Sequence, residues 1–218
     1  RLRLRNTSRR TRRLTVTSYV DWTLGPARAM AAPHTATELD EASGGIFARN
    51  LWVPAFAGQV AFSVLAGATG WTADRREFIG RNGSLAAPSA LAAEAVLSGR
   101  AGAGLDPCAV LQTTVALSPG EACDLVMLLG EAETSDAARD LIARYRAADV
   151  DASLSEAVAV WDDLLNAVQV KTPDRPLDLM LNGWLLYQTL ACRVWARSAF
   201  YQASGAYGFR DQLQDGMA

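Results

Sequence analysis

The residues best suited to chemistry lie in the segment GAYGFRDQLQD, residues 205–215. Arg210 carries a planar fork of hydrogen-bond donors, and the adjacent Asp211 carries acceptor oxygens. A sugar hydroxyl both donates and accepts, so this pair is suited to holding two neighbouring hydroxyls. The rings of Tyr207 and Phe209 can pack on the apolar face of a sugar. The segment is therefore a candidate carbohydrate site.

The same segment also has a purely structural interpretation. Asp211 and Asp215 are four residues apart, which places both carboxylates on one helical face if a helix begins here. Alternatively, Asp211 caps that helix and Asp215 bonds inside it. From composition alone an Arg210–Asp211 pair that fixes a loop is the commoner outcome, and spacing does not make either aspartate a general acid. Both interpretations stay open at this point.

The composition indicates one large domain, or one and a half ordinary ones, with a substantial core, because half of the 218 residues are hydrophobic and a fifth are charged. The longest apolar stretch, 179–192, is too short and too polar to cross a bilayer. Three widely spaced cysteines and one histidine argue against a zinc site and a disulfide framework. We expect no metal, and a reducing, cytoplasmic compartment.

Seven arginines and no acidic residue occupy positions 1–13, whereas the remaining residues hold 14 basic and 23 acidic groups. A nucleic-acid-binding arm would explain the arginines. However, Leu2 and Leu4 alternate with arginines at the period of a half-buried strand, and a β-branched segment follows at 14–20. We therefore predict a solvated β-hairpin and no nucleic-acid partner.

The first 130 residues predict antiparallel strands in a sandwich, because short apolar stretches alternate with turn residues. A Pro-Gly turn at Pro119–Gly120 predicts a hairpin between the last two strands. The predicted strands cover residues 14–22, 45–53, 59–67, 108–117 and 122–130.

Helical periodicity begins after residue 131. Ser135 is predicted to cap a helix to residue 148, and Ser153 with Glu156 predicts a capping box for a second helix. A third helix, about 176–200, is apolar nearly all round and must be covered on most sides. We therefore expect further helices to follow it in a longer protein.

The segment GAYGFRDQLQD resembles the motif at the start of the catalytic barrel in glycoside hydrolase family 94, the inverting glycoside phosphorylases. The stretch RNTSRRTRRLTVTSYVDWTLG (5–25), with His34, Glu38 and GGIFARN (44–50), resembles the N-terminal β-domain of that family. The resemblance implies an α+β protein of several parts. It predicts a partial antiparallel β-sandwich of the supersandwich type at 1–131, a helical linker at 132–172 and the start of a truncated (α/α)6 barrel at 173–218.

The resemblance also implies the chemistry, which is inverting phosphorolysis of β-glucans, most similar to enzymes of β-1,2-linked glucans. Arg210 and Asp211 match residues that hold the sugar in subsite −1, and Gln214 and Asp215 match supporting residues. The family's general acid belongs to a later motif that is missing from this sequence, so no catalytic residue is predicted here. Inorganic phosphate is the expected co-substrate, with no cofactor.

The expected partners are a β-glucan oligosaccharide and phosphate, and a homodimer of the full-length protein is compatible with the resemblance. The expected location is cytoplasmic, including as a cytoplasmic part of an inner-membrane synthase. The rival hypothesis is a non-catalytic carbohydrate-binding or subunit-contact β-sandwich module. We expect the tryptophans to be packing residues, and His34 to make a loop hydrogen bond.

Overall fold

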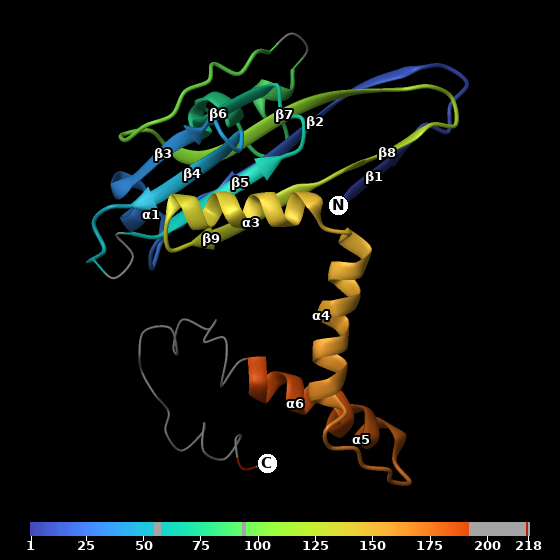
Figure 1. Ribbon diagram of the computed structural model, residues 1–218. Coiled ribbons are helices and arrows are strands. Elements are labelled where there is room, and N and C mark those ends of the chain that lie inside the picture. Colours follow the sequence, from blue (N-terminus) through green and yellow to red (C-terminus); the bar gives the residue numbers. More distant parts are fainter. Residues whose placement is uncertain (55–57, 93–94, 192–216, 218) are drawn as a thin grey trace. The chain divides into compact units, whose positions relative to one another are not determined.

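The computed structural model describes residues 1–54, 58–92, 95–191 and 217. The chain divides into two compact units, Arg1–Ala148 and Asp149–Ala218. The first unit consists mainly of antiparallel strands and the described part of the second is helical (Figure 1). This order confirms the predicted fold class of a β-sandwich followed by helices. The finer boundaries at residues 131 and 172 stay a prediction.

Three antiparallel sheets make up the first unit. One has the strand order β3–β4–β5–β9, the second β2–β7–β6, and the third consists of β1 and β8. The strands are β1 (Leu2–Arg5), β2 (Arg12–Asp21), β3 (Thr35–Asp40), β4 (Gly45–Asn50), β5 (Val60–Leu65), β6 (Gly70–Asp74), β7 (Pro107–Leu117), β8 (Ala122–Leu125) and β9 (Met127–Ala132). The helices are α1 (Arg28–Ala31), α2 (Arg75–Ile79) and α3 (Ser135–Ala147), with 3-10 turns η1 (Ala32–His34) and η3 (Ser89–Leu91).

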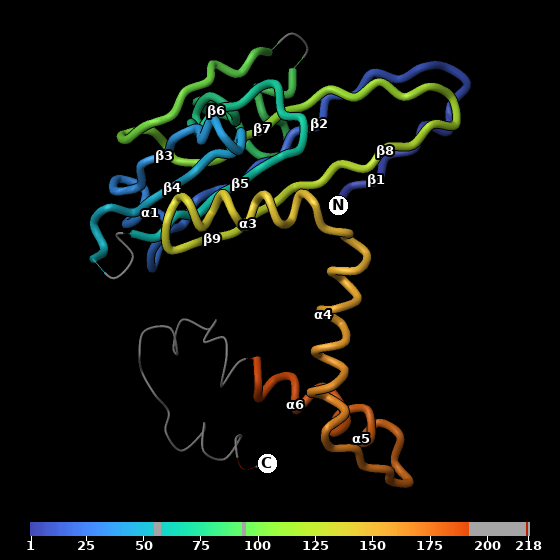
Figure 2. Tube along the Cα trace, in the orientation of Figure 1, coloured from blue at the N-terminus to red at the C-terminus, as the bar shows by residue number. Residues whose placement is uncertain are grey.

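Four of the five predicted strands are present as single strands, whereas the predicted strand 122–130 is divided into β8 and β9 of two different sheets. Both predicted hairpins are wrong. β1 pairs with β8, and β2 pairs with β7, so each N-terminal strand runs beside the 107–125 segment (Figure 2). Asn6 joins the two pairs: its side chain donates to the carbonyls of Leu117 and Arg10, at 2.8 Å each. The turn at Gly120 exists, but it connects two strands whose partners lie elsewhere in the sequence. β3 and β6 were not among the predicted strands.

Successive side chains of the four-stranded sheet point to opposite faces. Each face is covered by a hydrophobic core of its own. On the face toward the other strands, Ile46, Ala48 and Leu65 join a core that includes Trp22 and Leu111. The opposite face carries a second core in which α3 packs on β5 and β9 (Figure 1). This second core contains Phe47, Val60, Phe62, Val64, Ala138 and Ile142.

Helix α3 is attached to the sheet by hydrogen bonds and ion pairs as well as by its apolar face. Arg139 of α3 binds Asp40 of β3 through two nitrogens, at 2.9 and 2.7 Å. Arg49 of β4 donates to the hydroxyl of Ser135. Ser135 is therefore not the predicted cap: the Oγ1 of Thr134 caps the helix by accepting from the Ala137 amide at 3.1 Å.

The second unit contains α4 (Val150–Leu165), α5 (Arg175–Leu179), the π-helical turn η4 (Met180–Trp184) and α6 (Leu185–Gln188). The predicted capping box of Ser153 and Glu156 is wrong, because α4 begins earlier. Asp149 caps it by accepting from the amides of Asp151 and Ala152 at 2.8 and 3.3 Å. No helix in the described part of the chain has the length and apolar character needed to cross a bilayer.

Candidate functional site

The four site residues predicted from the sequence, Arg210, Asp211, Gln214 and Asp215, lie outside the described residues. Their arrangement therefore stays a prediction. A different concave site is present in the first unit.

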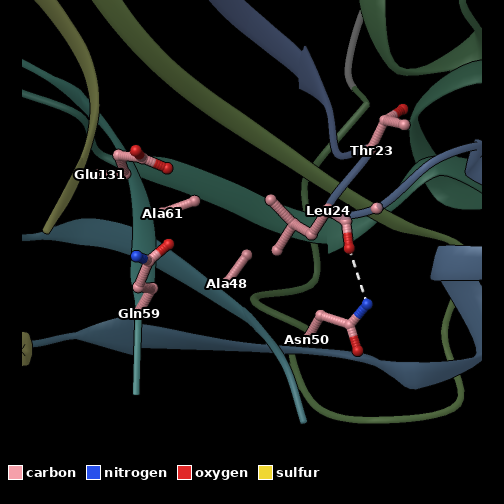
Figure 3. A pocket seen from close by; sticks show the side chains of 8 residues that line it. Thr23, Leu24, Ala48, Asn50, Gln59, Ala61 and Glu131 are labelled. Atoms are coloured by element: carbon pink, nitrogen blue, oxygen red, sulfur yellow. Dashed lines mark hydrogen bonds between the residues drawn. The ribbon is translucent and has the colours of Figure 1, made fainter. Parts of the chain in front are cut away.

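This site is a pocket with a volume of about 380 Å³ on one face of the four-stranded sheet (Figure 3). Its floor is a row across three strands: Ala48 of β4 is opposite Ala61 of β5, which is opposite Glu131 of β9. Asn50 and Gln59 lie two residues along the chain from Ala48 and Ala61, and they too line the pocket. The segment Thr23, Leu24 and Gly25 closes the opposite side.

Two small side chains on one face of the sheet leave room for the pocket. Ile46 and Leu65 fill the layer between the sheets. Ala48 and Ala61, on the same face, bring only a methyl group each. Leu24 packs against the edge of this core and projects toward the two alanines, so it forms an apolar wall (Figure 3).

Asn50 holds the wall in place. Its side chain is 5% exposed, and its Nδ2 donates to the Leu24 carbonyl at 2.7 Å. Its Oδ1 accepts from the amide of Trp52 at 2.9 Å. Both ends of this amide are therefore used by the protein, and the pocket wall is fixed before any ligand arrives.

The polar groups that remain available belong to Thr23, Gln59 and Glu131. No hydrogen bond or ion pair joins their side chains to other described residues, and Glu131 lies exposed on the edge strand β9. The eight lining residues include no arginine, lysine or histidine. The pocket thus offers an amide, a hydroxyl and one carboxylate beside an apolar surface.

An exposed aromatic ring, that of Trp52, lies two residues after Asn50 in the sequence. Trp52 is 66% exposed, and its ring stacks on His34 with centroids 4.6 Å apart. The prediction that the tryptophans are packing residues is correct for Trp22, at 4% exposed, and wrong for Trp52. For His34 the ring stacks, while its backbone carbonyl accepts from the amide of Leu51 at 3.3 Å.

A cluster of charged side chains lies at one end of β2 and β7. Arg28 binds Asp21 at 2.6 Å and Asp106 at 2.5 Å, and Arg75 approaches the same two carboxylates at 3.5 and 3.6 Å. Burial, together with the negative charges of Asp21 and Asp106, raises the pKa of the adjacent Cys108 thiol. These charges compensate one another and the thiol stays protonated, so the cluster is structural. Among the described residues no group of three histidine, cysteine or acidic side chains could hold a metal.

Two family models match the chain. The glycosyl hydrolase 94 supersandwich domain matches residues 1–148, and the catalytic domain of the glycosyl hydrolase 94 superfamily matches residues 160–218. The chain belongs to the glycosyl hydrolase 94 family. The pocket lies in the supersandwich part, whereas the predicted sugar-binding residues lie in the segment matched by the catalytic domain.

Relatives within the glycosyl hydrolase 94 family include a synthase and phosphorylases. The cyclic beta-(1,2)-glucan synthase NdvB of Rhizobium meliloti (strain 1021) is 43% identical over 100% of this chain and 8% of its own length. The N,N'-diacetylchitobiose phosphorylase of Vibrio furnissii is 34% identical over 51% of this chain and 14% of its own length. The solabiose phosphorylase of Paenibacillus borealis is 32% identical over 69% of this chain and 19% of its own length. The chain therefore spans less than a fifth of the length of each of these relatives.

Proposed function

We propose that this chain is part of a glycoside phosphorylase or glycosyltransferase that acts on β-glucans, with β-1,2 linkages as the preferred substrate. The observation that carries the proposal is that the catalytic-domain match extends across Arg210 and Asp211. One relative aligned over the whole chain is a cyclic beta-(1,2)-glucan synthase, which favours the β-1,2 linkage.

The proposed reaction is phosphorolysis with inversion. A carboxylic acid protonates the glycosidic oxygen, the bond from that oxygen to the anomeric carbon breaks, and a phosphate oxygen bonds to that carbon from the opposite face. Phosphate is already a nucleophile, so one protein carboxyl suffices and no cofactor is needed. We place this acid outside the 218 residues.

In this proposal Arg210 and Asp211 hold the hydroxyls of the sugar in subsite −1, and Gln214 and Asp215 support them. These contacts strengthen as the ring distorts toward the transition state. Loss of one charge-assisted contact of this kind costs about 2–4 kcal/mol of barrier. This corresponds to a rate loss of about 30- to 1,000-fold.

The test compares the 218-residue chain with a longer protein that also contains the rest of the catalytic domain. The longer protein should release glucose 1-phosphate from β-1,2-gluco-oligosaccharides and phosphate, while the 218-residue chain alone should not. Arg210→Ala and Asp211→Asn should each lower kcat/KM by about 30- to 1,000-fold, whereas Glu41→Gln, on an exposed turn, should not. Phosphate-dependent turnover by the 218-residue chain, or unchanged rates in both site variants, would contradict the proposal.

The rival function is a carbohydrate-binding or subunit-contact module without turnover, which the pocket of the first unit favours. Sugar binding without phosphorolysis in the longer protein would support this alternative. The cytoplasmic location and a homodimer of the full-length protein stay predictions.

A further inference from the structure

We propose that the pocket between Leu24 and the Ala48–Ala61–Glu131 row binds one pyranose unit of a glucan, as an accessory site formed by residues of the first unit. The choice of a glucan as ligand rests on the proposed function. The choice of a neutral polyhydroxylated ring rests on the pocket itself.

The size of the pocket suits a ring of this kind. Its volume of about 380 Å³ falls in the range of about 300–1,000 Å³ typical of sites for small ligands. It is much larger than a site for one water molecule, which occupies about 30 Å³ in the liquid. The wall and floor are fixed by sheet pairing and by the Asn50–Leu24 hydrogen bond, so little ordering is needed on binding.

The polar groups favour hydroxyls over ions. The amide of Gln59 both donates and accepts, the carboxylate of Glu131 accepts, and the hydroxyl of Thr23 does both. A phosphate or nucleotide would require positive charge, and none of the described residues that line the pocket carries one. A Ca²⁺ ion takes about six to eight oxygen ligands, and a single carboxylate does not supply them.

The apolar surface favours a pyranose over a small linear polyol. The side chain of Leu24 faces the methyl groups of Ala48 and Ala61 across the pocket (Figure 3). A pyranose ring has flat C–H faces flanked by hydroxyls at its edge. The ring can therefore lie between the apolar wall and floor while its edge reaches Gln59 and Glu131.

The core behind the pocket contains buried polar atoms that make no hydrogen bond to the described residues. Among the described residues, the buried side-chain atoms without a hydrogen-bond partner are Trp22 Nε1 and Ser63 Oγ. Trp22 directly precedes the 23–25 wall, and Ser63 lies two residues from Ala61 on the same face of β5. Such atoms are rare in protein interiors, but both residues are buried and neither lines the pocket, so they belong to the core behind it.

The experiment titrates the purified 218-residue chain with sophorose, the β-1,2-linked glucose disaccharide, by calorimetry and by amide NMR shifts. Ala61→Leu fills the floor and should weaken binding at least tenfold. Glu131→Gln, at an exposed edge position that does not threaten the fold, should weaken it about three- to tenfold, because the amide oxygen of glutamine still accepts and only the charge assistance is lost. Glu41→Gln is the matched control and should bind like the unaltered chain.

The variant Asp211→Asn separates this site from the proposed one. Binding that survives Asp211→Asn, but is weakened in both Ala61→Leu and Glu131→Gln, supports the pocket. No sophorose binding at all, or unchanged binding in both pocket variants, overturns the accessory site. If the pocket does not bind sophorose, the longer protein can still catalyse phosphorolysis. If the longer protein does not catalyse phosphorolysis, the pocket can still bind the sugar.

Discussion

Replacing Ile142 by alanine should strongly destabilise the first unit, because this side chain joins α3 to the sheet. Ile142 is 1% exposed and packs in the core with Phe47, Val60 and Phe62. The change removes three carbon groups, worth about 0.8 kcal/mol each on burial. A cavity that only partly collapses adds about 1–2 kcal/mol at 24 cal/mol per Å³. The expected loss in the free energy of unfolding is about 3–4 kcal/mol.

The assay is urea denaturation of the 218-residue chain, followed by the β-sheet signal in circular dichroism. That signal reports on the first unit, because the described part of the second is helical. Leu141→Ala is the matched control: it removes the same number of carbons from the preceding residue, which is only partly buried at the edge of the same core. This control should lose about half as much free energy or less.

The reasoning is refuted if Ile142→Ala costs less than about 1 kcal/mol, or if Leu141→Ala costs as much. A large loss would also affect the pocket. Helix α3 packs on the face of β5 opposite to Ala61, since Phe62 and Val64 point toward the helix. Loosening this support should weaken sophorose binding in Ile142→Ala more than in Leu141→Ala.

Two further predictions concern the same sheet. Gly130→Ala would bring a Cβ to 2.6 Å from Cζ of the buried Phe62, so it should cost about 1–3 kcal/mol; an unchanged urea midpoint would argue against this packing. At Asp40, burial alone would raise the pKa, but hydrogen bonds from Arg139 and Ser43 together lower it below the ordinary value of 3.8. The stability from this pair is therefore fully present above that pH and is lost as the pH falls through the folded-state pKa. Asp40→Asn should be less stable at neutral pH and should lose less on acidification, and parallel pH profiles of the two proteins would contradict this assignment.

Much of the local structure could be predicted from the amino-acid sequence. β-branched residues at 14–20 predict β2, and the apolar spacing after residue 135 predicts α3, because these signals depend on neighbours within one strand or one helical turn. Helix caps were less predictable: Thr134 and Asp149 cap α3 and α4 one to four residues before the predicted serines. A serine or aspartate signals a helix start nearby without selecting which residue accepts the first free amide.

The two candidate sites also differ in how far the sequence predicts them. The segment at 205–215 could be singled out locally, because an arginine, two aspartates and two aromatic rings lie within eleven residues. The pocket could not, because Ala48, Ala61 and Glu131 carry no distinctive local signal and come from three separate strands. Nothing in the sequence indicated that these three would form one row.

Which strands pair, and what they enclose, depends on contacts between distant parts of the chain. The turns at 6–11 and 118–121 look like hairpin connections, yet β1 pairs with β8 and β2 with β7. Choosing a strand partner depends on contacts more than 90 residues apart, such as Arg12 with Leu117, and on Asn6 bonding to Leu117. Local propensity makes a strand, whereas burying its apolar face against a distant segment selects the partner, the register and hence the pocket.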